Sequence, residues 1–561
     1  MKRIKRRQIH GIVLSAGIAI GTVFHYRDIL TREVERRQLS SSEIHTEYLR
    51  IQNAVDHVLE DLDEISRDTS KKIGRDHGAI FDVQKEILND PMLKADIEKE
   101  LREQRLNAEH IIRRVFRLWE NRFSTLDNQE MKERGHDIAD LGRHLLRTLT
   151  GSEGNVLRQV PENSVIVAER LLPSDTIRME DKNVVGFVTF QGGRNSHAAI
   201  LARALNIPMI SPVDTSIYEI PSRAKIILDG QSGEIIVHPT SRLLRKFESL
   251  MIQRRRAKNK WINATKGVCL RSGPRGIVVN ANVSTPGDIR KAKDHGCDGI
   301  GLYRVEQFYM SSKDMPPEDR VYHGLKDALW PVKEMPVTIR LLDLGGDKVL
   351  PHLDFPEQME SVLGLRGVRL LLKYENILRP QIRVLLRLAN EFKIQILVPM
   401  VSVPDDVIAI RKIIEEEKRR LKSQNINDLK TVPVGAMVET PAAVVSIKEI
   451  VECSDFISIG TNDLIQYTMA ADREKVSVSK YYEMGHQLII PWLDEIRKVA
   501  ESNGLDCSIC GEMAGDPSYT MQLLELGFRH FSVAPQLIPR IKYDIMNALQ
   551  RERRMTQSVI R

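Results

Sequence analysis

The stretch Val434-Gly-Ala-Met-Val-Glu-Thr-Pro-Ala442 begins as a short apolar run, reaches Glu439 and then continues through a Thr-Pro pair. A similar run, Phe456-Ile-Ser-Ile459, comes after a helical stretch and leads to Asn462 and Asp463. Short apolar strands that alternate with helices indicate βα units and a parallel sheet. Polar residues directly after such strands are typical of the edge where α/β barrels carry their chemistry.

The same alternation covers residues 266–561. Strand-like runs occur at Gly276–Val283, Gly299–Tyr303, Val337–Asp343, Lys393–Met400, Val434–Val438, Phe456–Ile459, Asp506–Ile509 and Phe531–Val533. Helical stretches separate most of them. Eight strands alternating with helices predict a C-terminal (β/α)8 barrel.

The upstream half is multidomain, with α and α/β parts. Apolar residues recur at steps of three and four from Tyr48 to Ile65, so residues 31–151 are predicted to form a helical bundle. Short strands then surround a helix at Ser196–Leu205. The strand-like N-terminal stretch has no sheet of its own, so we expect residues 1–30 and 152–240 to form one α/β domain into which the bundle is inserted. Residues 241–265 are predicted to be a linker helix.

The amino-acid composition argues against nucleic-acid binding and against a membrane protein. The 561 residues carry 83 Lys and Arg against 76 Asp and Glu, a net charge of +7, which favours a mixed solvated surface over nucleic-acid binding and suits a protein that handles anionic small molecules. Five cysteines favour a reducing, cytoplasmic location, and no apolar run is long enough for membrane insertion. Met1–Arg7 and Ile12–Ile20 resemble a secretory signal, but Gly11, Gly17 and Gly21 interrupt the apolar part and favour a strand of the mature fold.

Charged residues gather at the predicted ends of the barrel strands. They are Arg304, Glu306, Arg340, Asp343, Lys348, Arg366, Glu439, Asp463, Arg473 and Glu512, and the uncharged Asn462 and Cys510 lie among them. So many arginines at one edge indicate a bound anion, because guanidinium groups match phosphate and carboxylate. Two acidic side chains beside a phosphate suit Mg²⁺. The edge is predicted to bind a small, doubly anionic substrate together with a metal.

Cys510 closes the pair Cys507-Ser-Ile-Cys510. No second ligand pair at zinc spacing is present, and a redox pair is the remaining alternative. We expect Cys510 to emerge at the barrel mouth, where a thiol can act as an acid. Buried, inert side chains are expected for Cys269, Cys297, Cys453 and Cys507.

A second candidate site is the run Gly192-Gly-Arg-Asn-Ser-His-Ala-Ala-Ile200, which follows a strand and opens a helix. Ser196 is a plausible N-cap, which places His197 in the first helical turn. Backbone N–H groups there stabilise an anion, and imidazole is nucleophilic near neutral pH. A simple capping or surface histidine is the alternative.

These two sites together resemble Enzyme I of the phosphoenolpyruvate-dependent sugar phosphotransferase system, over essentially the whole chain. The motifs that carry the resemblance are Gly192–His197, Gly299–Arg304, Asp343–Lys348, Met437–Ala442, Ser458–Leu464, Ala471–Arg473 and Cys510–Glu512. Phosphate dikinases and phosphoenolpyruvate synthases share these motifs but also carry an ATP-binding domain, for which this chain has no room.

The resemblance implies a role for each site residue. His197 takes the phosphoryl group on Nε2, with Thr176 and Asp137 as partners, and Cys510 protonates the enolate to give pyruvate. Phosphoenolpyruvate is bound by Arg304, Arg340, Asn462, Asp463 and Arg473, with Arg366 and Lys348 also in the site. Glu439 and Asp463 match the Mg²⁺ ligands.

The resemblance also implies partners and movement. The inserted bundle docks the carrier protein HPr, and the barrel forms a homodimer. His197 lies in a different domain from the barrel site, so it must move between that site and HPr, with the hinge near Arg242–Lys260. A non-catalytic scaffold and an enzyme that uses a small-molecule acceptor are the alternatives.

Overall fold

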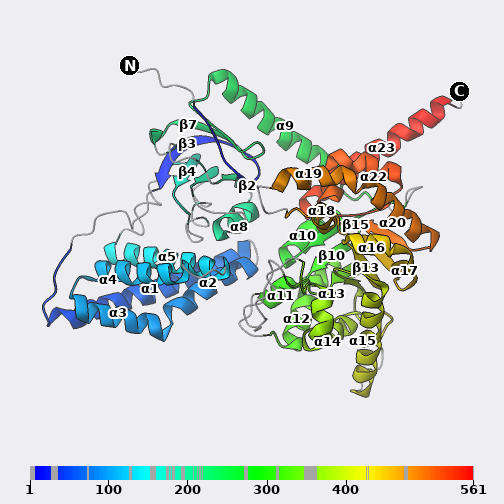
Figure 1. The fold of residues 1–561 in the computed structure, drawn as a ribbon. Helices are drawn as coiled ribbons and strands as arrows, with labels where there is room; N and C mark the ends of the chain where they lie inside the picture. The colour runs from blue at the N-terminus through cyan, green and yellow to red at the C-terminus, as the bar shows by residue number, and fades with distance from the viewer. Residues whose placement is uncertain are drawn as a thin grey trace. The chain divides into compact units, whose positions relative to one another are not determined.

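The computed structural model describes residues 7–26, 36–72, 75–124, 129–151, 160–171, 176, 179, 184–190, 196–205, 207–211, 213, 217, 219–270, 276–310, 315–345, 363–424, 426, 429–472 and 478–559. The chain forms two compact units, residues 1–255 and 256–561 (Figure 1). Each has hydrophobic cores of its own.

The first unit contains an eight-stranded sheet. Its strands are β1 (Arg7–His10), β2 (Val13–Ser15), β3 (Ile18–Tyr26), β4 (Ser164–Ala168), β5 (Gly186–Thr189), β6 (Met209–Ile210), β7 (Lys225–Asp229) and β8 (Glu234–Val237), in the order β1-β8-β7-β3-β4-β5-β6-β2. Strand β3 lies between β4, to which it is parallel, and the antiparallel β7. Pairing of the N-terminal stretch with the later α/β segment is therefore confirmed. Helix α8 (His197–Ala204) packs on this sheet through Ala199 and Ala202.

A helical bundle follows β3 in the chain. Its described helices are α1 (Glu43–Lys72), α2 (Arg75–Leu88), α3 (Pro91–Gln104), α4 (Ala108–Ser124) and α5 (Gln129–Thr150). Ile51, Val58 and Leu62 on α1 share one buried cluster with residues of the other helices, as their spacing predicts. Asp90 caps α3 by accepting the Met92 N–H at 2.7 Å, and this explains why a new helix starts there.

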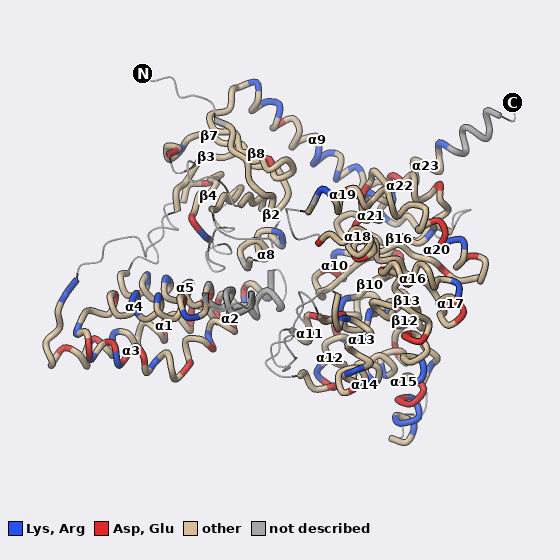
Figure 2. Tube along the Cα trace, in the orientation of Figure 1, with Lys and Arg blue, Asp and Glu red and all other residues tan. Residues whose placement is uncertain are grey.

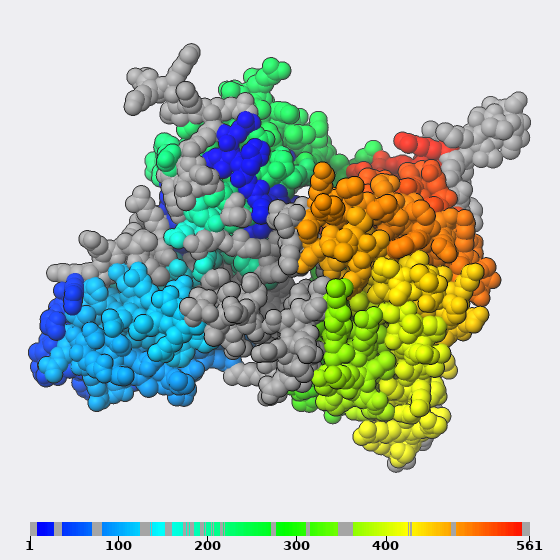
Figure 3. Space-filling view, in the orientation of Figure 1, coloured from blue at the N-terminus to red at the C-terminus, as the bar shows by residue number. Residues whose placement is uncertain are grey.

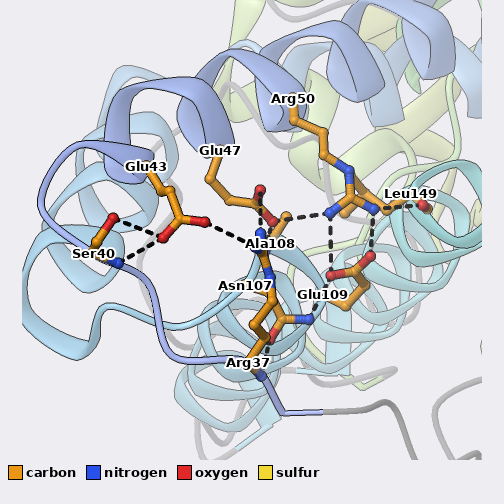
Figure 4. Close-up of polar contacts among 9 residues, drawn as sticks. All are labelled: Arg37, Ser40, Glu43, Glu47, Arg50, Asn107, Ala108, Glu109 and Leu149. Carbon is orange, nitrogen blue, oxygen red and sulfur yellow. Dashed lines mark hydrogen bonds and ion pairs between the residues drawn. The ribbon is translucent and has the colours of Figure 1, made fainter.

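A polar network ties three bundle helices together (Figure 4). The buried Glu47 of α1 accepts the Ala108 N–H at 2.7 Å, which satisfies a free donor at the start of α4. Arg50 pairs with Glu47 at 2.9 Å and with Glu109, and it also donates to the Leu149 carbonyl at 2.8 Å. The ends of α1, α4 and α5 are thereby linked by charge-assisted bonds.

Helix α9 (Ser241–Thr265) spans the division between the two units. Lys and Arg residues recur along it (Figure 2). Near its start Phe247 is buried with Ile236 of the first unit, and near its end Trp261 lies 4.2 Å beneath the Arg540 guanidinium of the second. The helix covers the residues 241–265 for which a linker helix is predicted, and each end packs on the unit that it adjoins.

The second unit is a closed parallel barrel. Its strands are β9 (Val278–Val283), β10 (Ile300–Arg304), β11 (Pro336–Arg340), β12 (Lys393–Val398), β13 (Val434–Val438), β14 (Phe456–Ile459), β15 (Asp506–Ile509) and β16 (His530–Val533), and β16 pairs with β9 to close the ring. The predicted eight-stranded barrel is confirmed. Three strands are shorter than predicted. Strand β9 begins only at Val278, β11 ends before Asp343, and β12 ends before Met400, whose φ of 57° leaves the extended region.

Helices surround this barrel in the ribbon view (Figure 1), and the surface of this unit is coloured green to red in the space-filling view (Figure 3). The described ones are α10 (Pro286–Asp294), α11 (Glu306–Met310), α12 (Glu318–Leu329), α13 (Val368–Lys373), α14 (Glu375–Leu388), α15 (Pro404–Ser423), α16 (Pro441–Val445), α17 (Ile447–Glu452), α18 (Thr461–Met469), α19 (Ser479–Leu488), α20 (Ile490–Ser502), α21 (Glu512–Gly515), α22 (Pro517–Leu526) and α23 (Ile538–Val559). No helix among the described residues is both long and apolar enough to cross a membrane.

The five cysteines are all free thiols. Cys297 is buried as expected, and Cys453 and Cys507 are partly exposed. The expectation of buried side chains is therefore wrong for Cys453 and Cys507. It is also wrong for Cys269, which is exposed in the connection between α9 and β9.

Candidate functional site

The carboxyl-terminal edge of the barrel gathers most of the predicted site residues. Arg304 and Arg340 are the last residues of β10 and β11, which pair with each other at that position. Glu439 follows β13, Asp463 lies in the first turn of α18 after β14, and Cys510 follows β15. Because all strands run in parallel, these strand ends meet at one edge.

Two buried arginines form a network with acids at this edge. Arg366 donates to both oxygens of Asp343, at 3.0 and 2.9 Å, and reaches Asp463 at 3.3 Å. Arg340 pairs with Glu306 and, at 3.2 Å, with Asp343. Burial opposes the charged form of Arg366, but Asp343 and Asp463 outweigh it and raise the pKa of Arg366. Both arginines stay charged, and their orientation is set before any substrate arrives.

Arg304 differs from these two arginines. Its side chain is exposed at the barrel edge, although it makes contacts within the protein. Its positive charge lowers the pKa of the buried Cys510 thiol. Arg304 is therefore the described arginine of this edge that is most accessible to an anionic ligand.

Glu439 is fully buried, and its two carboxylate oxygens differ. Oε1 accepts the Met400 N–H at 2.7 Å, whereas Oε2 has no hydrogen-bond partner among the described residues. Burial, followed by the charges of Asp463 and Asp343, raises the pKa of Glu439 to about 8. A buried oxygen without a donor, beside a second carboxylate, is a chemical setting that a divalent cation satisfies.

The fit to Mg²⁺ rests on Glu439 and Asp463. No group of three or more His, Cys, Asp or Glu side chains in the described part of the chain has the arrangement of a complete metal site. Mg²⁺ commonly uses one or two carboxylates and takes its other ligands from water and substrate phosphate. The residues present therefore fit a cation that is bound together with a phosphorylated substrate.

Gly367 allows close packing around Asp343 and Met400. Its φ of 57° is unfavourable for residues with a side chain, and an added Cβ would lie 2.7 Å from the Met400 Cβ and 3.4 Å from Asp343 Oδ1. Arg366 precedes it directly, and Met400 donates to Glu439. Because residue 367 is a glycine, the loop that carries Arg366 can lie close to Asp343 and to Met400, which donates to Glu439.

Gly367→Ala is expected to lower the free energy of unfolding by about 3 kcal/mol, because backbone strain and overpacking act together. Denaturant unfolding of the full chain measures this loss. Gly296→Ala is the matched control, since Gly296 has a φ of 74° with nothing within 4 Å of the added Cβ. Equal losses in the two variants would show that close packing against Met400 is unimportant.

Cys510 is 2% exposed and lies among Leu302, Leu397, Met437 and Phe456. Burial raises its pKa to about 11, so the thiol keeps its proton at neutral pH. It lies at the mouth of the barrel as expected, but as a buried and protonated group. Asn462, on α18, accepts the Glu512 N–H at 2.8 Å and so ties the loop after β14 to the loop after β15.

Three neighbours of these residues were missed in the sequence analysis. Ser458 donates to the Cys510 sulfur at 3.3 Å, Asn282 donates to the Cys510 carbonyl at 2.8 Å, and Tyr467 accepts from Arg366 at 2.9 Å. Ser458 and Asn282 are polar residues inside apolar strands, and that anomaly was the available signal.

The histidine region lies in the first unit. His197 is the first residue of α8, and Ser196 is its N-cap, accepting the Ala199 N–H at 3.3 Å, as predicted. Thr176 and Asp137 are both buried. The side chain of His197 lies outside the described part of the chain, as do Lys348 and Arg473.

Comparison with known proteins identifies the family. Three descriptions of PEP-utilising enzymes match in order: the N-terminal domain at residues 10–134, the mobile domain at 160–233 and the PEP-binding domain at 263–550. The phosphoenolpyruvate-protein phosphotransferase of Geobacillus stearothermophilus is 35% identical over 537 residues, covering 96% of this chain and 92% of that protein. The chain belongs to the Enzyme I family.

Two further relatives agree with this result. The phosphoenolpyruvate-protein phosphotransferases of Bacillus subtilis and Staphylococcus carnosus are 34% and 33% identical, covering 95% and 94% of this chain and 93% and 92% of theirs. In this Enzyme I the matched PEP-binding domain contains the whole barrel, and the matched mobile domain contains His197. The barrel site therefore lies in a domain described as PEP-binding, and His197 lies in a domain described as mobile.

Proposed function

We propose that this chain transfers the phosphoryl group of phosphoenolpyruvate to Nε2 of His197 and then to a histidine of HPr. In the first step the bond between phosphorus and the enol oxygen breaks as the N–P bond forms. The enolate then takes a proton on carbon from the Cys510 thiol, and pyruvate leaves. This is the first reaction of a sugar phosphotransferase system, and the full-length match to phosphoenolpyruvate-protein phosphotransferases is the observation that carries the proposal.

The barrel edge provides the positive charge that this reaction needs. Phosphoryl transfer depends mainly on positioning and on neutralising the phosphate oxygens. We assign Arg304, Arg340, Asn462, Asp463 and Arg473 to binding of phosphoenolpyruvate, with Arg366 and Lys348 adding charge. Asp343 pairs with both Arg340 and Arg366 and so fixes the orientation of the two guanidinium groups.

Glu439 and Asp463 would hold Mg²⁺, whose bound form neutralises phosphate charge and supports departure of the enolate. The unpartnered Oε2 of Glu439 supports this assignment. Cys510 suits the acid role because a thiol with a pKa of about 11 is protonated at neutral pH. Proton donation is expected to fade only as the pH rises toward that value.

The remaining parts of the proposal concern partners and location. The bundle α1–α5 is the surface that we assign to HPr, and the barrel is the part that we expect to form a homodimer. His197 would meet phosphoenolpyruvate at the barrel edge and HPr elsewhere, so the linker helix α9 must permit its movement. Five unpaired thiols support a reducing, cytoplasmic environment.

Labelling decides between this function and its alternatives. Phosphoenolpyruvate labelled in the phosphoryl group is mixed with the full chain and Mg²⁺, and the label is expected on the peptide containing residue 197 until HPr removes it. An unlabelled chain would favour a non-catalytic scaffold. Rapid pyruvate release without any carrier protein would favour an enzyme with a small-molecule acceptor.

Arg304→Ala is expected to lower kcat/KM for phosphoenolpyruvate by about 10- to 150-fold, the effect of losing a charge-assisted contact of about 1.5–3 kcal/mol. The rate of pyruvate release at varied substrate concentrations measures this loss. Arg290→Ala, which removes an exposed arginine from α10 on the outside of the barrel, is the control. Unchanged kinetic constants in Arg304→Ala would remove Arg304 from the binding site.

A further inference from the structure

The Cys510 thiol has few polar neighbours. Its Sγ donates to the Ile459 carbonyl at 3.2 Å, and the Ser458 hydroxyl donates to Sγ at 3.3 Å. Its other close surroundings are the apolar side chains of Leu302, Leu397, Met437 and Phe456. Both polar contacts come from β14, whose Ile459 carbonyl also accepts the Cys510 N–H at 3.0 Å.

These two polar contacts respond differently when the thiol loses its proton. The bond to the Ile459 carbonyl needs the S–H proton, so it is lost, and a carbonyl oxygen then faces a negative sulfur. The Ser458 bond runs the other way, with the hydroxyl as donor, and it strengthens because its acceptor becomes charged. Ser458 is 1% exposed, so no bulk water replaces it as a donor.

We propose that Ser458 is a positioning residue for proton donation by Cys510, holding the sulfur in place as a thiol and stabilising it as a thiolate. This inference rests on the proposed function, in which Cys510 protonates the enolate. As the S–H bond breaks and the C–H bond of pyruvate forms, the electron pair stays on sulfur. A donor that binds the thiolate more strongly than the thiol lowers the barrier of that step.

The charged groups around the thiol are consistent with this role. Burial raises the pKa of Cys510, the Ser458 hydrogen bond lowers it, and Glu439 raises it again. Arg304 and Arg340 lower it from the ends of β10 and β11. Among these groups, the Ser458 hydroxyl is the one that donates a hydrogen bond to the sulfur.

A matched pair of substitutions isolates the hydroxyl. Ser458→Thr and Ser458→Val add the same volume at the same buried position, but only threonine keeps an O–H. In a single turnover with labelled phosphoenolpyruvate and Mg²⁺, pyruvate formation is expected to be about 10- to 100-fold slower in Ser458→Val than in Ser458→Thr. The concentration of phosphoenolpyruvate needed for half-saturation is expected to stay within about threefold.

A change of solvent from water to deuterium oxide provides a second readout. The valine variant is expected to show a larger solvent isotope effect on pyruvate formation than the threonine variant, because proton transfer becomes slower relative to the other steps. A general loss of packing would not raise that effect. Ser458→Ala, which only removes atoms, provides the same comparison with wild type if the larger side chains prevent folding.

Ser508→Ala is the control, since Ser508 is the cross-strand neighbour of Ser458 on β15 but donates to the Ile457 carbonyl. It is expected to keep the rate of wild type. Equal rates and isotope effects in the threonine and valine variants, with wild type still labelled on His197, would overturn the inference alone. Absence of label on wild type would instead overturn the proposed function.

Discussion

His197→Ala is expected to abolish phosphorylation of the chain by phosphoenolpyruvate. Alanine has no nitrogen nucleophile, and the rate of HPr phosphorylation should fall to that of the assay without enzyme. The structure places residue 197 at the start of α8, where an N-cap serine and free backbone N–H groups favour a negative phosphoryl group. An acid-labile, base-stable label on the wild-type chain but not on the variant is the expected measurement.

A histidine elsewhere in the same unit provides the control. His57 is exposed on α1, so His57→Ala is expected to be labelled as well as wild type. A label that persists in His197→Ala would assign the phosphoryl group to another residue. Because nothing else in α8 changes, a folded His197→Ala chain without label separates the loss of the nucleophile from the loss of the domain.

Cys510→Ala is expected to slow pyruvate formation by about 10²- to 10⁴-fold, the usual contribution of a general acid. Binding of phosphoenolpyruvate should be nearly unchanged, because the thiol lies among apolar side chains and the arginines remain in place. Cys510→Ser is expected to be slow as well, since a serine hydroxyl is a much weaker acid than a thiol. Titration of phosphoenolpyruvate by calorimetry, together with single-turnover rates, separates binding from chemistry.

Cys507→Ala is the matched control for Cys510→Ala. Cys507 lies on the same strand, burial raises its pKa to about 12, and it has no assigned role. Near-normal turnover in Cys510→Ala would remove the thiol from the acid role. A comparable loss in Cys507→Ala would indicate that packing of β15 is responsible instead of proton donation.

Local patterns along the chain predicted the helices and strands well, but they placed the ends of two barrel strands too late in the sequence. Within the predicted bundle, α3 begins where it does because Asp90 caps its first turn. The predicted strand ends at Asp343 and Met400 were wrong, since apolar residues continue past the last ladder hydrogen bond. At Asp343 the side chain turns to meet Arg340 and Arg366, and at Met400 a positive φ aims the N–H at Glu439.

The amino-acid sequence alone determined the order of the domains, the eight-stranded barrel and the residue types at its carboxyl-terminal edge, because periodicity and turn residues act over a few positions. Only the tertiary structure decided that Arg366 meets Asp343, that one oxygen of Glu439 lacks a donor, and that Ser458 bonds Cys510. These contacts join residues from different strands and loops. Their partners depend on how the closed ring of strands sets each strand end beside the next, which no local pattern contains.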